Sequence, residues 1–270
     1  MFRKNELKRR LSGGETLFGV WIHTGSVTCS ELLAHQGFDF LIFDLEHSPG
    51  ELKDAVEVLR ALQGTGTACV VRVPWNDHVV LKKVLDAGFD SIMIPSVDTA
   101  EEAEAAVQAC RYPPHGRRGY GAPAVRASGY GATPDYAARA AEELLLIIQL
   151  ETAKSLENAA AICAVDGVDV PFIGVSDLSG SLGYLERADH SAVRGKIEEV
   201  EKVLKASGKP LGTVPSAGAS WGDLVRRGYK LIPMAADVSF LRAGAKEAVE
   251  QIRSARANGE APEARPASTY

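Results

Sequence analysis

Short apolar runs alternate with longer amphipathic segments along almost the whole chain. The runs are mostly continuous rather than alternating, which is typical of parallel strands that are buried on both faces. The pattern predicts eight strands, at 16–22, 39–45, 67–73, 90–95, 144–151, 170–175, 210–214 and 231–236. Amphipathic periodicity predicts helices at 28–36, 51–63, 76–87, 99–110, 153–164, 191–207, 218–227 and 239–256.

Several predicted helices end in glycine, and an aromatic residue and a new apolar run follow. This phrase recurs in GFDFLIFD, GFDSIMIP and GYKLIPMA, and indicates a repeated helix–turn–strand unit. Eight such units in about 240 residues predict an α/β fold with a single (β/α)8 TIM barrel. A doubly wound sheet is the alternative, because the sequence does not show closure. We expect the barrel, with an N-terminal and a C-terminal helix, to span 1–256 and a polar, disordered tail to occupy 257–270.

Composition narrows the class of protein further. The 270 residues include 35 acidic and 30 basic ones, and this net charge of -5 gives no basis for binding nucleic acid. No apolar run approaches the ~20 residues that cross a bilayer. The basic segment 1–10 lacks the apolar stretch and cleavage site of a secretory signal. The four cysteines form no CxxC pair, so we expect reduced thiols in a cytoplasmic protein.

Polar residues cluster where the predicted strands end, which in a βα barrel is where the active site lies. The second strand ends in Asp44, Glu46 and His47, and the fifth ends in Gln149 and Glu151. His23 follows the first strand, Arg72 ends the third, and Ser176 and Asp177 follow the sixth. Strands seven and eight end in small or apolar residues, so the polar groups converge from one side of the barrel.

Glu151 and Asp177 are candidate metal ligands. They follow neighbouring parallel strands, which lie about 4.8 Å apart. Two carboxylates so close repel each other unless a cation lies between them. Oxygen ligands with open coordination positions suit a hard divalent ion such as Mg²⁺ or Mn²⁺. The alternative is a salt-bridged surface carboxylate at Glu151 and a helix N-cap at Asp177.

His47 and Arg72 are candidate catalytic residues. His47 could act as a general base or be structural. We expect the permanently charged Arg72 to meet a substrate oxyanion or carboxylate, the alternative being an ion pair with Asp44 or Glu46. No predicted strand ends in lysine, which argues against a Schiff base and favours metal-assisted chemistry.

The irregular segment 111–137 is rich in Gly, Pro, Tyr and Arg. A long loop of this kind is typical of a functional or interface element. His115, Arg117 and Arg118 within it could bind an anion or be solvated.

Seven segments together resemble the HpcH/HpaI aldolase family of metal-dependent pyruvate aldolases. They are FGVWIHTGS, GFDFLIFDLEHSPG, VVRVPWND, LKKVLDAGFDSIMIPSVDTAEEA, RYPPHGRRGYG, IIQLET and VDGVDVPFIGVSDLSGSLG. The likeness runs from about residue 5 to 250, and RYPPHGRRGYG and the Glu46-His47 step are its most specific parts. The resemblance implies cleavage or formation of a 4-hydroxy-2-oxo acid, giving pyruvate and an aldehyde through a metal-stabilised pyruvate enolate. It also implies a bound Mg²⁺, Mn²⁺ or Co²⁺, and a trimer or trimer of dimers, often with an exchanged C-terminal helix.

The resemblance assigns roles to individual residues. It makes His47 the base, Arg72 the group that steadies the transition state, and Asp86 the carboxylate that raises the basicity of His47. Glu151 and Asp177 correspond to the metal ligands. Arg72, Gln149 and Ser176 correspond to substrate-contacting positions, Ser176 through its backbone. Because Asp86 comes late in a helix, at the end facing away from the barrel mouth, we expect it to reach His47 across a subunit interface or by a bent local path.

The sequence departs from the family pattern beside the site. Leu45 stands where the family commonly has glycine, Ser96 where it has methionine, and Val175 where it has proline. These departures bear on substrate choice more than on metal binding. Two alternative functions remain, a citrate-lyase-β-like lyase acting on a CoA thioester through the basic loop 111–126, and a catalytically silent barrel that binds a 2-oxo acid.

Overall fold

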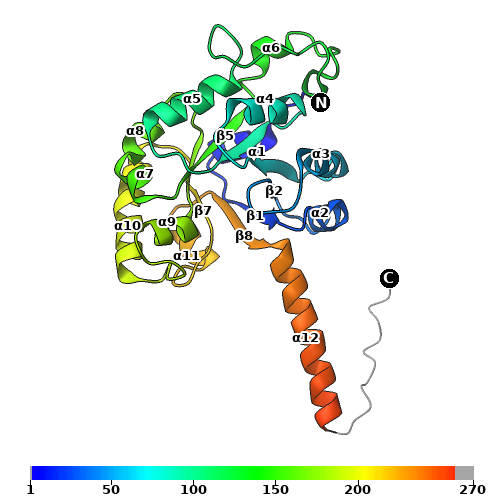
Figure 1. The fold of residues 1–270 in the computed structure, drawn as a ribbon, viewed down its shortest axis with the longest axis vertical. Helices are drawn as coiled ribbons and strands as arrows, with labels where there is room; N and C mark the ends of the chain where they lie inside the picture. Colours follow the sequence, from blue (N-terminus) through cyan, green and yellow to red (C-terminus); the bar gives the residue numbers. More distant parts are fainter. Residues whose placement is uncertain (1, 259–270) are drawn as a thin grey trace.

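The chain folds into a closed barrel of eight parallel strands that pair in chain order, with β8 returning to β1 (Figure 1). A computed structural model describes residues 2–258. The strands are β1 (Leu17–Ile22), β2 (Phe40–Asp44), β3 (Ala68–Arg72), β4 (Ser91–Ile94), β5 (Leu145–Leu150), β6 (Val170–Ile173), β7 (Gly212–Thr213) and β8 (Leu231–Ala236). All eight predicted strands are present. The predicted (β/α)8 barrel is confirmed, and the doubly wound alternative is wrong.

Helices surround the barrel between successive strands. They are α1 (Glu6–Ser12), α2 (Val27–Ala34), α3 (Leu52–Ala61), α4 (His78–Asp86), α5 (Ala100–Cys110), α6 (Tyr136–Arg139), α7 (Ala153–Glu157), α8 (Ala159–Ala164), α9 (Val175–Ser181), α10 (Ser191–Ala206), α11 (Trp221–Arg226) and α12 (Asp237–Ala257). A short 3-10 turn, η1 (Arg126–Ser128), lies in the irregular segment. The helix predicted over 153–164 is divided at Asn158 into α7 and α8. Most of the predicted tail, 259–270, lies outside the described residues.

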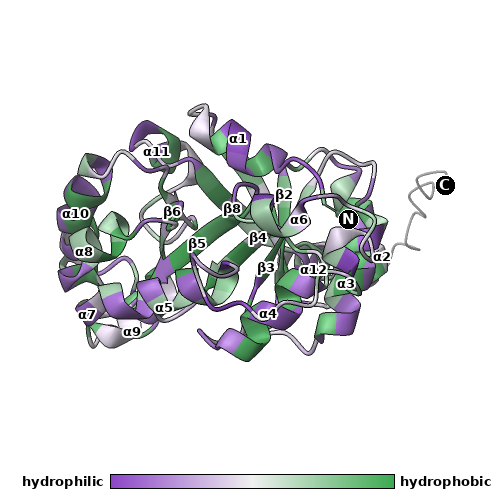
Figure 2. Ribbon diagram, turned by 90° about the horizontal axis from the view of Figure 1, so that it is seen from above, coloured by the Kyte–Doolittle hydropathy of each residue, from purple (hydrophilic) through white to green (hydrophobic). Residues whose placement is uncertain are grey.

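Two apolar clusters hold the barrel together. The inner one fills the barrel with side chains such as Phe40, Met93 and Phe172. Leu7 and Leu11 of α1 join this inner cluster, and Asn5 ties the helix to the barrel by donating to the carbonyls of Asp90 and Glu143, each at 3.0 Å. The outer cluster lies between the strands and the surrounding helices. Figure 2 shows the result, with mostly hydrophobic strands inside a ring of helices that have one hydrophilic side.

The last helix, α12, projects away from the barrel body (Figure 1). Its first residue, Asp237, is 2% exposed and accepts hydrogen bonds from the backbone N–H groups of His23 and Thr24 at 2.9 and 3.0 Å. Nearly every residue after the first turn is exposed. None of the helices in residues 2–258 is long and apolar enough to cross a membrane.

All four cysteines are free thiols, as expected. Cys69, Cys110 and Cys163 are buried, and Cys29 is partly buried. Burial raises the pKa of Cys69 and Cys110 to about 12, which keeps these thiols protonated and unreactive.

Candidate active site

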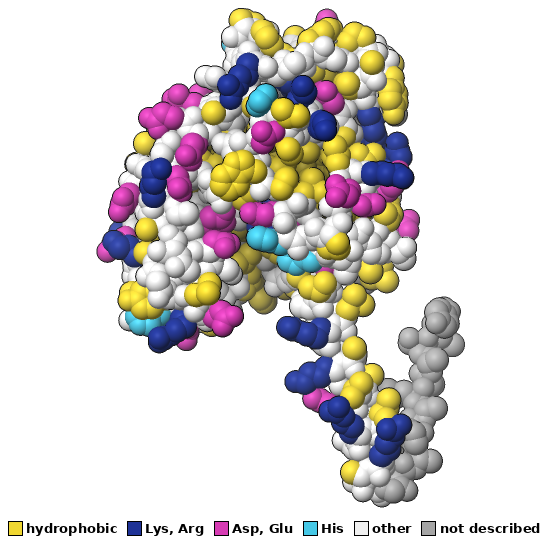
Figure 3. All heavy atoms as spheres, viewed as in Figure 1, with side chains coloured by type: hydrophobic (Ala, Val, Ile, Leu, Met, Phe, Trp, Pro, Cys, Tyr) yellow, Lys and Arg dark blue, Asp and Glu magenta, His cyan; other side chains and the backbone are white. Residues whose placement is uncertain are grey.

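A cavity of about 340 Å³ opens at the carboxyl ends of the strands. Its wall consists of Trp21, His23, His47, Arg72, Gln149, Phe172, Gly174, Val175, Ser176, Asp177 and Val214. Six of the polar residues that the sequence placed at strand ends therefore meet around one space, namely His23, His47, Arg72, Gln149, Ser176 and Asp177. Figure 3 shows histidine and acidic side chains gathered near the middle of the barrel body, above the point where α12 leaves it.

Arg72 is buried in the cavity wall and paired with a buried carboxylate. Its Nε lies 2.8 Å from Asp44 Oδ1, its Nη2 2.6 Å from Asp44 Oδ2, and its Nη1 3.1 Å from Glu46 Oε2. The guanidinium also lies over the Trp21 ring, 4.4 Å from its centre. The ion pair with Asp44 and Glu46, which was the alternative interpretation of Arg72, is therefore present. It holds the guanidinium in place while Arg72 still lines the cavity.

Asp44 is fully buried beneath Arg72. Burial by itself would raise the pKa of Asp44, but hydrogen bonding with His23 and Arg72 and the charge of the guanidinium hold it well below its usual range. Asp44 therefore stays ionised and acts as a fixed negative support for Arg72.

Glu151 follows β5 and lies behind the cavity wall, 3% exposed. Its Oε1 accepts hydrogen bonds from the backbone N–H of Ser96 at 2.7 Å and from Ser96 Oγ at 3.2 Å. Its Oε2 accepts one from Gln149 Nε2 at 3.2 Å. Burial raises the pKa of Glu151 to about 6, and the negative charges of Asp177 and Glu46 contribute to the rise. Glu151 is thus a buried carboxylate, not the surface carboxylate of the alternative interpretation.

The carboxylates around the cavity suit a divalent cation. Burial also raises the pKa of Glu46, with the charges of Asp44 and Asp177 adding to the effect and that of Arg72 opposing it. A cation among these oxygens would relieve the repulsion that disfavours their ionised forms. Within residues 2–258, no three His, Cys, Asp or Glu side chains form a metal cage by themselves. Glu151 and Asp177 supply carboxylate oxygens, the donors that a hard divalent ion prefers, and the charge of Asp177 contributes to the raised pKa of Glu151.

Two backbone features hold Glu151 in place. Ser96 has a φ of 53°, in the left-handed region that residues other than glycine rarely adopt, and this conformation accompanies its N–H donation to Glu151. At Gly174, a Cβ atom would collide with the Glu151 side chain, so glycine is needed there. Strain and close approach at the same carboxylate are typical of a functional site.

The remaining predicted residues lie at the rim. The His47 side chain follows β2 and is 59% exposed, with Nε2 3.7 Å from Glu46 Oε2. Ser176 and Asp177 occupy the first turn of α9 and are exposed to the cavity. The N-cap of α9 is Gly174 and Asp177 is its third residue, so the alternative of a helix N-cap at Asp177 is wrong, and the side chain lies in the cavity wall.

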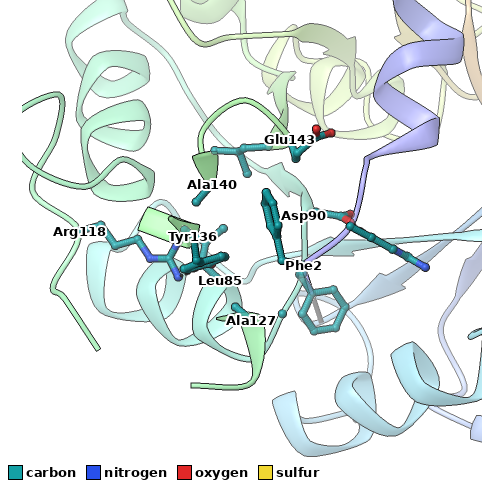
Figure 4. A pocket seen from close by; sticks show the side chains of 12 residues that line it. Phe2, Leu85, Asp90, Arg118, Ala127, Tyr136, Ala140 and Glu143 are labelled. Carbon is teal, nitrogen blue, oxygen red and sulfur yellow. Dashed lines mark hydrogen bonds and ion pairs between the residues drawn. The ribbon is translucent and has the colours of Figure 1, made fainter. Parts of the chain in front are cut away.

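Asp86 does not join this cavity within the chain. It is the last residue of α4, at the opposite end of the barrel, and its carboxylate lies 2.7 Å from Arg118 Nη2. The Arg118 side chain is 1% exposed and its guanidinium lies 4.4 Å from the ring centre of Tyr112 and 5.9 Å from that of Tyr136. Figure 4 shows Arg118 beside Tyr136. The bent local path from Asp86 to His47 is therefore wrong.

The same contacts change the interpretation of the basic loop. Arg118 is buried and paired, so it is not available to an external anion. Arg111 pairs with Asp166 at 2.6 Å. Only His115 and Arg117 of the proposed anion-binding residues are exposed, which weakens the case for a nucleotide site in 111–126.

Several residues at the cavity were not identified from the sequence. Trp21, Phe172 and Val214 face it from β1, β6 and the end of β7, and a strand-end rule for polar residues does not detect apolar walls. His23 was noted only as following a strand. Of the family departures, Ser96 contacts Glu151, Val175 lines the cavity, and Leu45 packs against the outer cluster. Ser96 therefore touches the candidate metal ligand itself.

Comparison with known proteins identifies the family of the chain. The chain is 39% identical over 237 residues to a hydroxypyruvate/pyruvate aldolase of Roseobacter denitrificans, which covers 88% of this chain and 93% of that one. It is 36% identical over 249 residues to a 5-keto-4-deoxy-D-glucarate aldolase of Salmonella arizonae, and the match covers 92% of this chain and 97% of that one. A crystal structure of an HpcH/HpaI aldolase/citrate lyase family protein from Burkholderia cenocepacia superposes with a TM-score of 0.87 at 36% identity, covering 93% of this chain and 100% of that one. Residues 17–243 match the family itself, and the chain belongs to the HpcH/HpaI aldolase/citrate lyase family.

Proposed function

We propose that the protein is a divalent-metal-dependent aldolase that cleaves or forms a 4-hydroxy-2-oxo acid, with pyruvate or a close 2-oxo acid and an aldehyde as the other reactants. The observation that carries this proposal is the convergence of Arg72, Gln149, Asp177 and His47 on one cavity, with Glu151 directly behind its wall. Membership in the family makes the protein a carbon–carbon lyase. Relatives named for hydroxypyruvate, pyruvate and a keto-deoxy sugar acid support a 2-oxo acid as substrate.

Glu151 and Asp177 would hold the metal ion, for which Mg²⁺, Mn²⁺ and Co²⁺ are the candidates. Such an ion, when bound, supplies a Lewis acid that polarises the carbonyl of the 2-oxo acid. Gln149 links the two halves of the site, because its Nε2 donates to Glu151 and its Oε1 accepts from Arg72 Nη1 at 3.5 Å. Gln149 thereby keeps a carboxylate and a guanidinium at a fixed separation.

Arg72 stabilises the negative charge that develops on the substrate oxygen during carbon–carbon cleavage. A guanidinium held by a buried carboxylate needs no reorganisation when that charge appears, which is the condition for effective electrostatic stabilisation. His47 takes the proton of the 4-hydroxyl group in cleavage and that of the pyruvate methyl group in synthesis. Ser176 contacts the substrate through its backbone at the start of α9.

Removing a metal ligand should abolish metal binding and turnover together. For Glu151→Gln we expect the affinity for Mn²⁺, measured by isothermal titration calorimetry, to fall on the order of 100-fold or more, because a neutral amide replaces a buried carboxylate. Pyruvate release from a 4-hydroxy-2-oxo acid should fall with it, and EDTA should stop the wild-type reaction. Glu142→Gln, at an exposed position, is the control. A wild-type enzyme that keeps full activity in EDTA would overturn the metal assignment.

The exposed face of α12 supports assembly with further copies of the chain. Val238, Leu241, Ala245, Val249 and Ile252 follow one another at helical spacing and form a stripe along the helix. Four of these side chains are 41–57% exposed (Val238 42%, Leu241 57%, Val249 44% and Ile252 41%), and Figure 3 shows hydrophobic side chains open along the helix. An apolar stripe on a projecting helix is stable in water when a second copy covers it.

Charges on this stripe should weaken the oligomer. We expect the double variant Leu241→Glu, Ile252→Glu to have a lower molar mass than the wild type by size-exclusion chromatography with light scattering, because both side chains would have to be buried. Arg242→Glu with Arg253→Glu adds acidic residues next to the stripe and should retain the wild-type mass. A wild-type monomer, or equal masses for both double variants, would contradict assembly through α12.

The position of Asp86 leads to a second expectation about assembly. Because Asp86 is remote from His47 within the chain, its proposed action on His47 requires a neighbouring subunit. Mixed oligomers of His47→Ala and Asp86→Asn chains should regain activity, since some sites then combine an intact His47 with an intact Asp86. The Asn variant is chosen because its amide oxygen can still accept the hydrogen bond that Arg118 Nη2 donates to Asp86. Mixtures that assemble but stay inactive would show that Asp86 does not act across the interface.

A further inference from the structure

His23 is held rigidly in the cavity wall, although the proposed reaction gives it no role. It directly follows β1 and lines the same space as Arg72, Gln149 and Asp177. Its backbone N–H donates to the buried carboxylate of Asp237 at 2.9 Å. Its ring stacks on Trp21, with the ring centres 5.9 Å apart and the planes 24° apart. The backbone and one face of the ring are therefore fixed.

The two ring nitrogens of His23 have different surroundings. Nε2 is shielded from solvent and lies 3.2 Å from Asp44 Oδ2, although its N–H is not well aligned with that oxygen. Asp44 is already bound by two guanidinium nitrogens of Arg72. A lone pair on Nε2 would face this carboxylate and be repelled, so the neutral imidazole carries its hydrogen on Nε2.

The Nδ1 atom is consequently the ring nitrogen that a molecule in the cavity can reach. In the neutral ring, with the hydrogen on Nε2, Nδ1 is an uncharged acceptor. No residue in 2–258 donates a hydrogen bond to Nδ1. The side-chain oxygen acceptors that line the cavity are the Asp177 carboxylate, the Ser176 hydroxyl and the Gln149 amide. The Gln149 oxygen already accepts a hydrogen bond from Arg72. A rigid uncharged acceptor in such a wall is suited to a hydroxyl donor.

We propose that His23 is a specificity-determining residue whose Nδ1 accepts a hydrogen bond from a hydroxyl group of the substrate. The protein then prefers hydroxylated substrates over their deoxy analogues. The hydroxyl can belong to the 2-oxo acid or to the aldehyde, since both occupy the cavity during the reaction. This inference rests on the proposed function, because it assumes that a 2-oxo acid and an aldehyde are the ligands.

Two substitutions separate recognition from support. His23→Phe keeps a flat ring for Trp21 to stack on and removes the acceptor. His23→Asn places an amide oxygen close to the position of Nδ1 and removes most of the ring. If His23 only supported Asp44 and Arg72, both variants would lower kcat with every substrate alike. If it binds a hydroxyl, His23→Phe loses the preference and His23→Asn retains part of it.

The test compares hydroxypyruvate with pyruvate, and glycolaldehyde with acetaldehyde, in the presence of Mg²⁺ at mildly alkaline pH. We expect His23→Phe to lower the preference for the hydroxylated over the deoxy member of one pair, measured as the ratio of their kcat/KM values, by about 10-fold and mainly through KM. The pair that responds identifies which reactant bears the hydroxyl. Calorimetric titration of hydroxypyruvate and pyruvate onto each variant gives a second readout that needs no turnover.

The outcomes distinguish this inference from the proposed function. A wild-type protein that turns over neither pair, yet binds the hydroxylated acid more tightly in a His23-dependent manner, would contradict aldolase activity and support the role of His23. Turnover by the wild type with equal preference for both members of each pair, or an equal loss for both in His23→Phe, would overturn the role of His23 and leave the aldolase proposal intact. A wild type that neither binds nor converts any of the four compounds would contradict both.

Discussion

Replacing Arg72 by alanine is expected to lower kcat by about two to three orders of magnitude, the usual effect of losing one preorganised electrostatic donor at an active site. The guanidinium is buried in the cavity wall and held by two hydrogen bonds to Asp44. No lysine and no second arginine within residues 2–258 lines this cavity, so no permanently charged neighbour can replace it. The measurement is steady-state pyruvate release, with circular dichroism at the same temperature to show that the variant is folded.

Two further variants serve as controls for Arg72→Ala. Arg72→Lys keeps the charge but not the paired geometry, so it should recover only part of the activity. Arg111→Ala removes an arginine whose ion pair with Asp166 lies near the surface, and it should leave kcat within about twofold of the wild type. An Arg72→Ala enzyme with near-normal kcat would show that the guanidinium serves the fold and not the reaction.

Asp44→Ala is expected to lower the free energy of unfolding by about 3–5 kcal/mol, the usual cost of breaking a buried ion pair. Asp44 is fully buried, and its removal leaves the guanidinium of Arg72 with only Glu46 as a counter-charge. Urea unfolding at neutral pH measures the loss. The double variant Asp44→Ala, Arg72→Met should lose less than the sum of the two single variants, because neither member of the Asp44–Arg72 pair is left buried without the other. Additive losses would contradict a coupled pair.

The pH dependence of this loss follows from the depressed pKa of Asp44. Burial opposes ionisation, but His23 and Arg72 together hold the pKa below that of the unfolded chain. The contribution of Asp44 to stability is therefore fully present above the unfolded pKa of about 3.9, and it is lost as the pH falls through the folded value. The difference in unfolding free energy between wild type and Asp44→Ala should shrink as the pH falls below about 4. A difference that grows on acidification would show that Asp44 is not stabilised in its ionised form.

The sequence by itself determined the barrel and the end of it that holds the site. Continuous apolar runs such as that of β5 (Leu145–Leu150) fix the strands, because a strand buried on both faces needs no polar side. Once the strands are known, the position of Arg72 or Gln149 at a strand end places each side chain at the mouth of the barrel. These are local consequences of strand periodicity, and they need no knowledge of which residues touch.

Only the tertiary structure decided which charges are paired. Spacing along the chain does not show that Arg72 pairs with Asp44 from the neighbouring strand, or that His23 Nε2 faces that same Asp44 carboxylate. Nor does it show that Arg118 forms an ion pair with Asp86 at the far end of the barrel. The charge state of each side chain, and the donors and acceptors that it has left for a ligand, depend on burial and on partners distant in sequence. A strand-end rule predicts where a polar group lies, whereas close packing decides what that group is still free to bind.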